Sequence, residues 1–529
     1  MSERDDEAPQ NPGPRPELVE LRQKLHALSD AGRPHAVEKR RKTNQRTARE
    51  NIADLVDPGT FVEYGAHAVA AQRTRYDADE LARISPADGI LCGVASVNRA
   101  LFDAERARTM ILAYDYTVLA GTQGHYGHRK LDRMLALAAE RKIPIVLFAE
   151  GGGGRPGDID VHTVAGLDTT SFLGFAALSG LVPRVGIASG RCFAGNAALL
   201  GCADVVIATE NSNIGMGGPA MIEGGGLGKF TPEEIGPVDV QTKNGVIDVK
   251  VADEAEAVAV AKKYLGYFQG RLSSWEAADQ APLRDALPES RRRAYKIRPI
   301  IQRIADVGSV LELRRDFGRS ILTALVRIEG RPFGLLANDT MYLGGAIDSD
   351  ASDKAARFLQ LCDAFGLPVV SLCDTPGFMV GPKAETTALV RHTSRMFVAA
   401  ASLRVPYFTV VLRKGYGLGA QAMSGGHFHA PFFTVSWPTG EFGGMNLEGA
   451  VRLSMKKQLE AIEDPEQREA TFRSMVGIAY ERGKALNMAA LLEIDAVIDP
   501  AETRHWLVRG VESVPPPDPA RPRRYVDTW

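Results

Sequence analysis

The chain has 529 residues, of which 45% are hydrophobic and 24% charged, and its formal net charge at pH 7 is −2. This length favours two or more domains, and the near-neutral charge gives no support for a nucleic-acid or membrane-surface partner, which would favour a strongly basic face. The five cysteines form no CxxC pair, which suits a reducing cytoplasm and argues against a disulfide framework or a zinc ribbon.

The amino-terminal residues 1–15 are acidic and rich in proline, without the apolar core of a signal peptide, so we expect a disordered tip there. No run of about 18 apolar residues occurs, and no transmembrane helix is predicted. A charged helical segment is expected over 36–56, "AVEKRRKTNQRTARENIADLV". Its basic run is interpreted as a solvated helix face, with contact to a phosphate group as the alternative.

Two long stretches repeat one pattern at a constant offset of 224 residues, the offset that relates Gly195 to Gly419. In each copy an apolar strand is followed by a glycine-bearing loop and an amphipathic helix. We expect these elements over 109–114, 120–127 and 128–141, and again over 333–338, 343–350 and 352–365. Strands that alternate with helices predict a parallel β-sheet with crossover helices, built twice.

The residues identical at this offset include glycine, proline and charged positions, which argues against chance. They are Leu112, Asp115, Gly121, Lys130, Arg133 and Pro144, with their mates in the second copy. The first predicted helix has one apolar face, made of Leu131, Met134, Leu135 and Ala138. A polar, proline-marked segment over 273–295 is interpreted as the interdomain linker.

The third strand of each copy runs into a bland, small-residue turn: "GRCFAGNAALLG" over 190–201 and "KGYGLGAQAMSG" over 414–425. A strand that delivers such a turn to a helix start leaves backbone N–H groups without partners and pointing outward, and the helix dipole adds roughly half a positive charge there. These turns therefore suit the stabilisation of an oxyanion by amides alone. A tight strand–helix connection is the alternative for either turn taken singly.

The span of about 15–515 resembles the carboxyltransferase (β) subunit of biotin-dependent acyl-CoA carboxylases. The motifs that carry the resemblance in the second half are "EGRPFGLLAN", "DSDASDKAARFLQLCDAFGLPVVSLCDTPGF", "RKGYGLGAQAM", "SWPTGEFGGMNLEGAV" and "IDAVIDPAETR". In the first half "DPGTFVE", "GTQG", "EGGGGR" and "KNGV" keep the expected order. The resemblance implies an α/β fold of two crotonase-like (ClpP/crotonase ββα-spiral) domains related by internal duplication, an acyl-CoA-binding domain over 16–275 and a biotin-binding domain over 290–529.

The same resemblance implies a carboxyltransferase, an enzyme of lipid metabolism within a C–C bond-forming ligase complex. A carboxyl group would move from carboxybiotin on a partner protein to the α or vinylogous carbon of an acyl-CoA, through an enolate. The implied cofactors are therefore biotin on the partner and the coenzyme A of the substrate, with no metal. The implied site contains two oxyanion holes, one at the amides of Gly195 and Asn196 and one at those of Leu418 and Gly419. The implied substrate contacts are Gly121, Gly152, Gly153, Arg155, Ala420 and Gln421. The implied biotin contacts are Pro376, Gly377 and Phe378.

This chain departs from the family pattern at several positions. Asn196 stands where a second glycine is common, and asparagine tolerates left-handed backbone angles better than most residues. Val240 replaces a histidine, and "GGGGR" over 151–155 replaces "SGGAR". Ala420 and Gln421 replace a bulky aromatic residue and its successor. We expect alanine at 420 to enlarge the acyl pocket, which favours a branched or longer acyl-CoA.

Other functions stay open or are disfavoured. The same scaffold serves biotin-dependent decarboxylases, and Asn196 with Val240 leaves a catalytically silent assembly subunit possible. A crotonase-type hydratase normally needs a pair of glutamates beside the hole, and none lies near Gly195 in the sequence. The glycine run over 151–154 lacks the Lys-Ser/Thr of a phosphate-binding loop. The glycine-rich segment 221–230 is interpreted equally as a mobile active-site loop or a plain surface loop.

Two clusters could bind a metal but are interpreted as structural. His427 and His429 are expected on one strand face, without a visible third ligand, and Asp348, Asp350 and Asp353 are expected to cap the following helix. The expected partners are an acyl-CoA and a biotin carboxylase/biotin carrier (α) subunit, in the cytoplasm. A shared active site and two apolar segments, "AALLGCADVVIA" and "AMSGGHFHAPFF", predict a tight two-fold dimer, stacked into a hexamer as a trimer of dimers.

Overall fold

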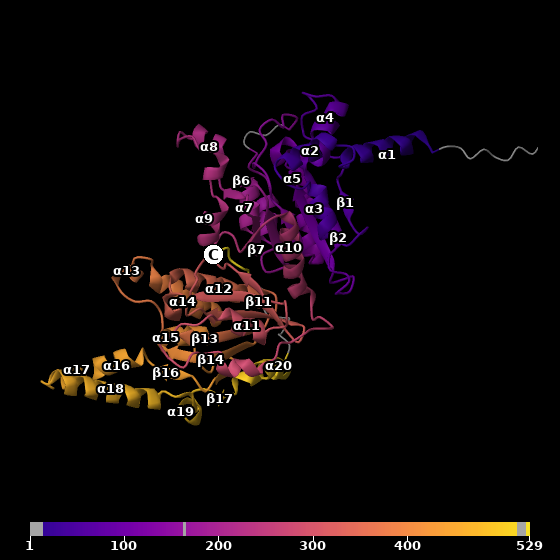
Figure 1. Ribbon diagram of the computed structural model, residues 1–529. Helices are drawn as coiled ribbons and strands as arrows, with labels where there is room; N and C mark the ends of the chain where they lie inside the picture. The colour runs from indigo at the N-terminus through magenta and orange to yellow at the C-terminus, as the bar shows by residue number, and fades with distance from the viewer. Residues whose placement is uncertain (1–13, 162–165, 516–524) are drawn as a thin grey trace, which may run out of the picture.

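The computed structural model describes residues 14–161, 166–515 and 525–529. The expected disordered tip therefore lies outside the described residues, apart from residues 14 and 15. The chain forms two halves that lie one above the other, and its carboxyl end returns to the junction between them (Figure 1).

The first half is built on a seven-stranded sheet in the order β1-β2-β3-β4-β5-β7-β9. Strands β1, β2 and β3 pair antiparallel, and every pairing from β3 onward is parallel. The strands of this sheet are β1 (Val62–Tyr64), β2 (Ile90–Ser96), β3 (Arg108–Tyr114), β4 (Ile145–Phe148), β5 (Arg184–Ala188), β7 (Val205–Thr209) and β9 (Val249–Val251), while β6 (Arg191–Phe193) and β8 (Asn213–Gly215) pair with each other.

The second half repeats this arrangement in an eight-stranded sheet, in the order β10-β11-β12-β13-β14-β15-β17, with β16 paired to β14. Two antiparallel pairings again precede the parallel ones. Its strands are β10 (Leu311–Leu313), β11 (Ile321–Ile328), β12 (Arg331–Asn338), β13 (Val369–Thr375), β14 (Tyr407–Tyr416), β15 (Phe433–Ser436), β16 (Glu441–Gly443) and β17 (Ala496–Val497). The predicted α/β fold, built twice along the chain, is confirmed.

The helices cover the faces of these sheets, so the parallel strands are buried and read as continuous apolar runs. Those of the first half are α1 (Pro16–Leu28), α2 (Pro34–Lys42), α3 (Ala48–Leu55), α4 (Ala78–Ile84), α5 (His125–Arg141), α6 (Ser171–Ala176), α7 (Gly195–Gly201), α8 (Pro219–Gly224), α9 (Val238–Lys243) and α10 (Glu254–Gln269). Those of the second half are α11 (Arg298–Ile304), α12 (Ser349–Ala364), α13 (Pro382–Glu385), α14 (Leu389–Ala400), α15 (Gly417–Met423), α16 (Leu447–Ser454), α17 (Lys456–Glu460), α18 (Pro465–Arg482), α19 (Ala485–Ala490) and α20 (Thr503–Ser513).

Helices α5 and α12 are the repeat-related pair, and each begins three residues before its predicted start. The predicted apolar face of α5 is buried. Each helix carries a lysine at the same repeat position that donates to two main-chain carbonyls: Lys130 Nζ to Ala87 O (2.9 Å) and Ile90 O (2.6 Å), and Lys354 Nζ to Phe317 O (2.9 Å) and Ile321 O (2.7 Å). A buried ammonium group needs such acceptors, so the duplication has kept a specific interior contact as well as a fold.

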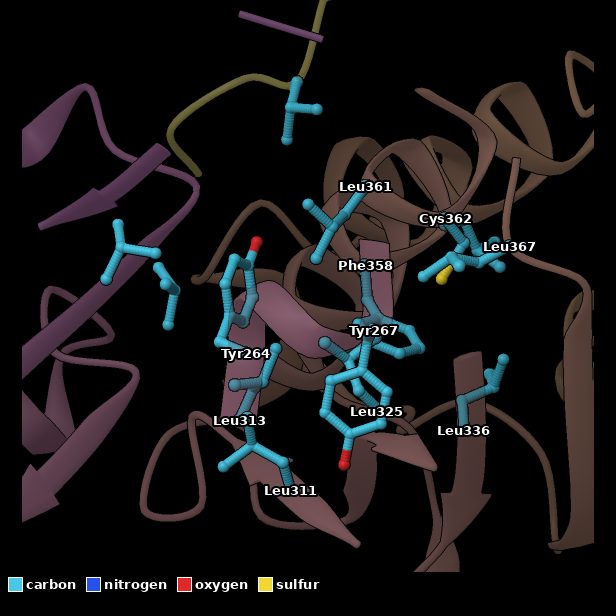
Figure 2. Packing of buried hydrophobic residues seen from close by; sticks show 14 of the residues in the cluster. Tyr264, Tyr267, Leu311, Leu313, Leu325, Leu336, Phe358, Leu361, Cys362 and Leu367 are labelled. Carbon is cyan, nitrogen blue, oxygen red and sulfur yellow. The ribbon is translucent and has the colours of Figure 1, made fainter. Parts of the chain in front are cut away.

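The two halves share one hydrophobic core through α10. The rings of Tyr264 and Tyr267 on this helix belong to the same buried cluster as Leu313, Leu325 and Phe358 of the second half, and Figure 2 shows these side chains around the helix. All five are at most 3% exposed. Removing either half would therefore expose large apolar side chains of the other.

Polar contacts reinforce the junction. On α12, Arg357 donates to the carbonyls of Ala203 (3.3 Å) and Asp204 (2.8 Å) in the first half, and to Asp527 O in the carboxyl-terminal segment (3.1 Å). That segment also contacts the first half, because Val526 N donates to Ser179 Oγ at 2.8 Å. The carboxyl-terminal segment and α12 thus hold the two halves together.

Three local predictions need correction. The charged segment forms two helices, α2 and α3, because Thr47 and Glu50 make a capping box that starts α3. Its basic run is not entirely a solvated face, because Arg40 is 5% exposed and pairs with Glu150 at 2.7 Å. The segment 221–230 begins inside α8 rather than in a loop.

The three aspartates expected to cap α12 differ in role. Asp348 is the N-cap and accepts from Ala351 N at 2.9 Å. Asp353 lies inside the helix, is 2% exposed and pairs with His392 at 2.6 Å and with Arg395. Among the residues that the structure describes, no helix combines the length and apolarity that a bilayer crossing would require.

The junction supplies a stability test with a control inside the repeat. Arg357 is 4% exposed, whereas its repeat mate Arg133 is exposed. We expect Arg357→Met to lower the free energy of unfolding by about 3 kcal/mol, since it leaves buried carbonyls without donors. Arg133→Met is expected to change it by less than about 0.5 kcal/mol. Urea denaturation measures both, and equal losses would contradict the importance of this contact.

Candidate active site

The first small-residue turn, over 190–201, places two backbone amides without hydrogen-bond acceptors among the described residues at the start of α7. Ala194, between β6 and α7, has φ 50° and ψ −122°, an unusual backbone conformation for a residue with a side chain. Its amide donates to Gly215 O at 3.0 Å, and its carbonyl accepts from Ala198 N at 2.8 Å. Within the described residues, the N–H groups of Gly195 and Asn196 donate no hydrogen bond, as the geometry of a helix start predicts.

The side chain of Asn196 ties the neighbouring loops to this turn. It is fully buried, with Oδ1 accepting from Gly153 N at 3.1 Å and Nδ2 donating to Gly121 O at 3.4 Å. The expectation that asparagine is tolerated here for its left-handed backbone is wrong, because Ala194 takes the positive φ and Asn196 is helical. The asparagine is instead a connector whose side chain points away from solvent.

Glycine is required in the two loops because of close backbone approach. A Cβ on Gly121 (φ +64°) would lie 2.5 Å from Glu150 O, and one on Gly153 (φ +84°) would lie 2.6 Å from the Cβ of Ala194 and 3.1 Å from Gly195 N. Gly152, exposed beside them, faces Thr122. The structure thus brings Gly153 to the amide of Gly195 and Gly121 to the side chain of Asn196, whereas a Cβ on Gly152 would contact neither.

The guanidinium of Arg155 bonds to other residues of this chain. Its guanidinium is 4% exposed and pairs with Asp88, and it donates to Thr122 O at 3.0 Å. Burial raises the pKa of the Asp88 carboxyl, and the charge of Arg155 opposes that rise. In this arrangement the arginine holds the 122–124 loop in place, and its charge is not available to a substrate as the resemblance implied.

Two glutamates bear on the hydratase alternative. Glu150 is buried and pairs with Arg40, and burial raises the pKa of its carboxyl. Glu254, the other buried glutamate of this region, accepts from Arg46 N at 3.1 Å. Both carboxylates are engaged with α2 and the segment that follows it.

The second turn repeats the first at the start of α15. Gly417 has φ +57°, and the amides of Leu418 and Gly419 donate no hydrogen bond among the described residues. A Cβ on Gly419 would lie 2.7 Å from Gly377 Cα, so the predicted biotin-contact loop lies directly against this helix start. That loop is held by Ile347 N, which donates to Gly377 O at 3.1 Å.

The side chains that follow Gly419 do not share one environment. Ala420 is 0% exposed and belongs to the core cluster, and its expected effect on an acyl pocket stays a prediction. Gln421 lines a surface cavity of about 610 Å³ with His427, Phe442 and Leu447. Pro376 and Phe378 are partly buried beside Gly377, and the ring of Phe378 packs edge-on against Phe397.

The remaining sequence candidates lie outside these turns. His427 and His429 occur in a turn rather than on a strand, where His429 N donates to His427 Nδ1 at 3.0 Å. Val240 lies on α9 and is 53% exposed. Within the described part of the chain, no group of three or more His, Cys, Asp or Glu side chains is placed to hold a metal ion.

The two amide pairs lie in different halves, with α12 and α14 between α7 and α15 in Figure 1. One chain therefore does not bring its two helix starts together. Sequence reasoning missed two residues beside the first pair, Gln123 and Phe172, whose side chains come closest to Gly195. Gln123 lies in the "GTQG" motif, but nothing in the pattern around Phe172 distinguishes it from a core residue.

Comparison with known proteins supplies the chemistry. The family model described as "Carboxyl transferase domain" matches residues 39–514. The methylmalonyl-CoA carboxyltransferase 12S subunit of Propionibacterium freudenreichii subsp. shermanii is 31% identical over 512 residues, covering 94% of this chain and 93% of the relative. The biotin-dependent long chain acyl-coenzyme A carboxylase beta4 subunit of Mycobacterium tuberculosis is 32% identical over 512 residues, covering 93% of each.

Solved structures agree. A single-chain, multi-domain long-chain acyl-CoA carboxylase is 57% identical with a TM-score of 0.89; the match covers 94% of this chain and 49% of that one, so this chain corresponds to about half of it. The transcarboxylase 12S structure with methylmalonyl-coenzyme A and methylmalonic acid bound has a TM-score of 0.82 at 28% identity, over 96% of this chain and 97% of that one.

The connecting role of Asn196 is open to test. We expect Asn196→Ala to lower the free energy of unfolding by about 1–3 kcal/mol, since it leaves the buried amide of Gly153 without an acceptor. Hydrogen exchange should also speed up over residues 151–155, because that loop loses its tie to α7. Asn244→Ala is the control, because Asn244 is exposed and its side chain bonds only to near neighbours in the chain, Gln241 and the amide of Val246. Unchanged exchange in the loop would contradict the connecting role.

Proposed function

This chain belongs to the carboxyl transferase family and is a carboxyltransferase that acts on acyl-CoA, and from that premise we propose that it transfers a carboxyl group from carboxybiotin, carried by a partner protein, to the α or vinylogous carbon of an acyl-CoA. The observation that carries the proposal is the pair of helix starts, at Gly195 and at Gly419, each with two amides that find no acceptor in the part of the chain that the structure describes. Two such pairs of donors, one in each half of the chain, suit two acceptor oxygens, one on the thioester and one on biotin.

The first pair, Gly195 and Asn196, would bind the thioester oxygen as it takes up charge. Two N–H donors held at a helix start are preorganised, so they favour the enolate over the neutral thioester. One such donor is typically worth about 2.7–4 kcal/mol of transition-state stabilisation. The bare glycines of 121 and 153 are what allow a loop backbone to lie against this pair, as the Cβ distances above indicate.

The second pair, Leu418 and Gly419, would bind the ureido oxygen of biotin. The fit is supported by two free donors and by the Gly377 loop, which lies so close to Gly419 that only glycine is accommodated. When bound, the cofactor would supply the carboxyl group and a ureido nitrogen to accept the substrate's α-proton, so that the N–C bond of carboxybiotin is exchanged for a C–C bond at the acyl-CoA. The protein then contributes positioning and electrostatics.

Two alternatives use the same residues. In a decarboxylase the carboxyl group would move from a carboxylated acyl-CoA to biotin, and the first amide pair would still hold the enolate. A silent assembly subunit is disfavoured because Asn196 keeps a helical backbone and turns its side chain away from the amides. We propose the carboxylating direction, and a longer acyl-CoA as substrate. The long-chain acyl-CoA carboxylase that is 57% identical supports that choice of substrate.

The assembly is proposed as a dimer with shared sites, stacked into a hexamer. The transcarboxylase 12S relative is described as a hexamer, and the two amide pairs of one chain lie in separate halves. Of the two apolar segments predicted for this interface, the first has Leu199 and Leu200 buried in its own chain, whereas the second has Met423 buried but Phe432 48% exposed. Exposed apolar side chains beside the two turns, Leu173 (73%) and Leu418 (62%), are better candidates for a covered face.

The remaining proposals concern partner and compartment. A biotin carboxylase and biotin carrier would regenerate carboxybiotin, as the name "beta chain" of several relatives suits. A reducing cytoplasm suits the five cysteines, all of which are free thiols.

Activity is tested with free carboxybiotin as donor. The purified chain should carboxylate acyl-CoA from carboxybiotin, and should fix no carbon dioxide with ATP and bicarbonate alone. We expect Gly195→Ala to reduce transfer about 10²–10³-fold, since a Cβ there would lie 2.2 Å from Gln123 Oε1 and disturb the amide pair. Gly201→Ala, whose Cβ meets nothing within 4 Å on the same helix, is the control. Transfer that survives Gly195→Ala unchanged would contradict the amide mechanism.

Shared sites are tested by mixing variants. Gly195→Ala chains and Gly419→Ala chains should each be inactive, since each removes one of two required amide pairs. After subunit exchange half of the dimers are mixed, with one intact site of two, so about a quarter of the parent activity should return. A mixture that stays inactive after exchange is verified by mass spectrometry would exclude the shared-site assembly while leaving the transferase function in place.

A further inference from the structure

The side chain of Phe172 lies beside the first amide pair. Its Cζ atom is 3.2 Å from the position that a Cβ would take on Gly195, and Gln123 Oε1 occupies the adjoining position at 2.2 Å. Phe172 is 37% exposed, so one part of its ring faces solvent while its tip faces the helix start. An acyl chain whose carbonyl oxygen is bound at Gly195 would pass this ring.

A hydrogen-bond network of Ser171, His128 and Asp132 fixes the start of α6, which carries Phe172. Ser171 Oγ donates to Asp132 Oδ1 at 2.5 Å, and His128 Nδ1 lies 2.9 Å from the same Ser171 Oγ. Because a carboxylate only accepts, the single hydroxyl hydrogen of Ser171 is committed to Asp132, and His128 Nδ1 must carry the hydrogen that it donates to the serine. Ser171 is 0% exposed.

The network anchors α6 to α5 on both sides of Ser171. Thr170 Oγ1 donates to the second oxygen of Asp132 at 2.9 Å, and the ring of His128 lies 6.2 Å from that of Phe172, centroid to centroid. Burial lowers the pKa of His128, which favours the neutral ring in this setting. The next residue, Leu173, is 73% exposed, so the two apolar side chains of this turn have different environments.

We propose that Phe172 is a specificity-determining residue, whose ring forms the wall against which the first carbons of the acyl chain pack, and that Ser171, His128 and Asp132 are positioning residues that hold this wall. The proposal rests on the proposed function, because it needs the acyl-CoA thioester to be bound at Gly195. In this proposal the ring contributes to binding only when the acyl chain is long enough to reach it.

The test compares acetyl-CoA and hexanoyl-CoA as acceptors of the carboxyl group from free carboxybiotin. Phe172→Ala should reduce kcat/KM for hexanoyl-CoA about tenfold, mainly through KM, because the ring contributes binding area to ground and transition states alike. The value for acetyl-CoA should change less than threefold. Leu101→Ala, an exposed leucine (59%) in the segment between β2 and β3, is the control and should leave the ratio of the two substrates unchanged.

The positioning residues are tested by a conservative pair. Asp132→Ala removes the acceptor of Ser171 and should lower the same hexanoyl/acetyl ratio at least threefold. Asp132→Asn keeps an oxygen that can accept from Ser171, so it should restore most of the parent ratio. A structural defect alone would reduce both substrates together and leave the ratio unchanged.

The outcomes separate the two proposals. If the parent chain transfers no carboxyl group to any acyl-CoA, the proposed function fails. If the parent is active but Phe172→Ala reduces both substrates equally or neither, the ring is no acyl wall and this inference fails alone. An equal loss for both substrates at parent-like stability would instead place the ring against the coenzyme A portion.

Discussion

The candidate site depends on one constraint, which is how closely a loop backbone can approach the start of a short helix. At the first turn the loop of Gly153 lies so near that a Cβ would approach Gly195 N to 3.1 Å, and at the second turn Gly377 leaves no room for a Cβ on Gly419. These contacts hold the helix starts rigidly while leaving their amides free to donate. The side chain of Asn196, the pairing of Arg155 with Asp88 and the hydrogen bonds of Ile347 all support that approach.

The fold and the location of the two turns could be predicted from the sequence because both depend on local patterns repeated at a fixed offset. The apolar face of α5, the alternation of strands and helices along each copy and the glycine turns follow from residue spacing and from the conformational needs of glycine, whereas the antiparallel pairing of β1 with β2 and of β10 with β11 is not predicted by them. What each side chain does could not be predicted as well. Arg155 and Asp353 occupy motif positions that point to contact with a substrate or to capping, yet each side chain is buried in an ion pair.

Phe172 illustrates the opposite case. Its sequence context, a short apolar helix, is that of an ordinary core residue, and only its distance to Gly195 gives it a place in the site. The difference is physical: periodicity reports which face of a helix is buried, but not which buried or half-buried side chain ends beside a functional backbone atom. Residues that act through proximity leave no local signal, whereas glycines that permit proximity do.

The core shared through α10 has a further consequence for how a duplicated chain evolves. Tyr264 and Tyr267 come from the first copy but pack with side chains of the second, and α12 of the second copy reaches back to Ala203 and Asp204. Once such contacts exist, neither copy can fold without the other, and selection acts on the pair as a unit. Matching positions then differ in role: Arg133 is exposed, whereas Arg357 is buried and connects the two copies.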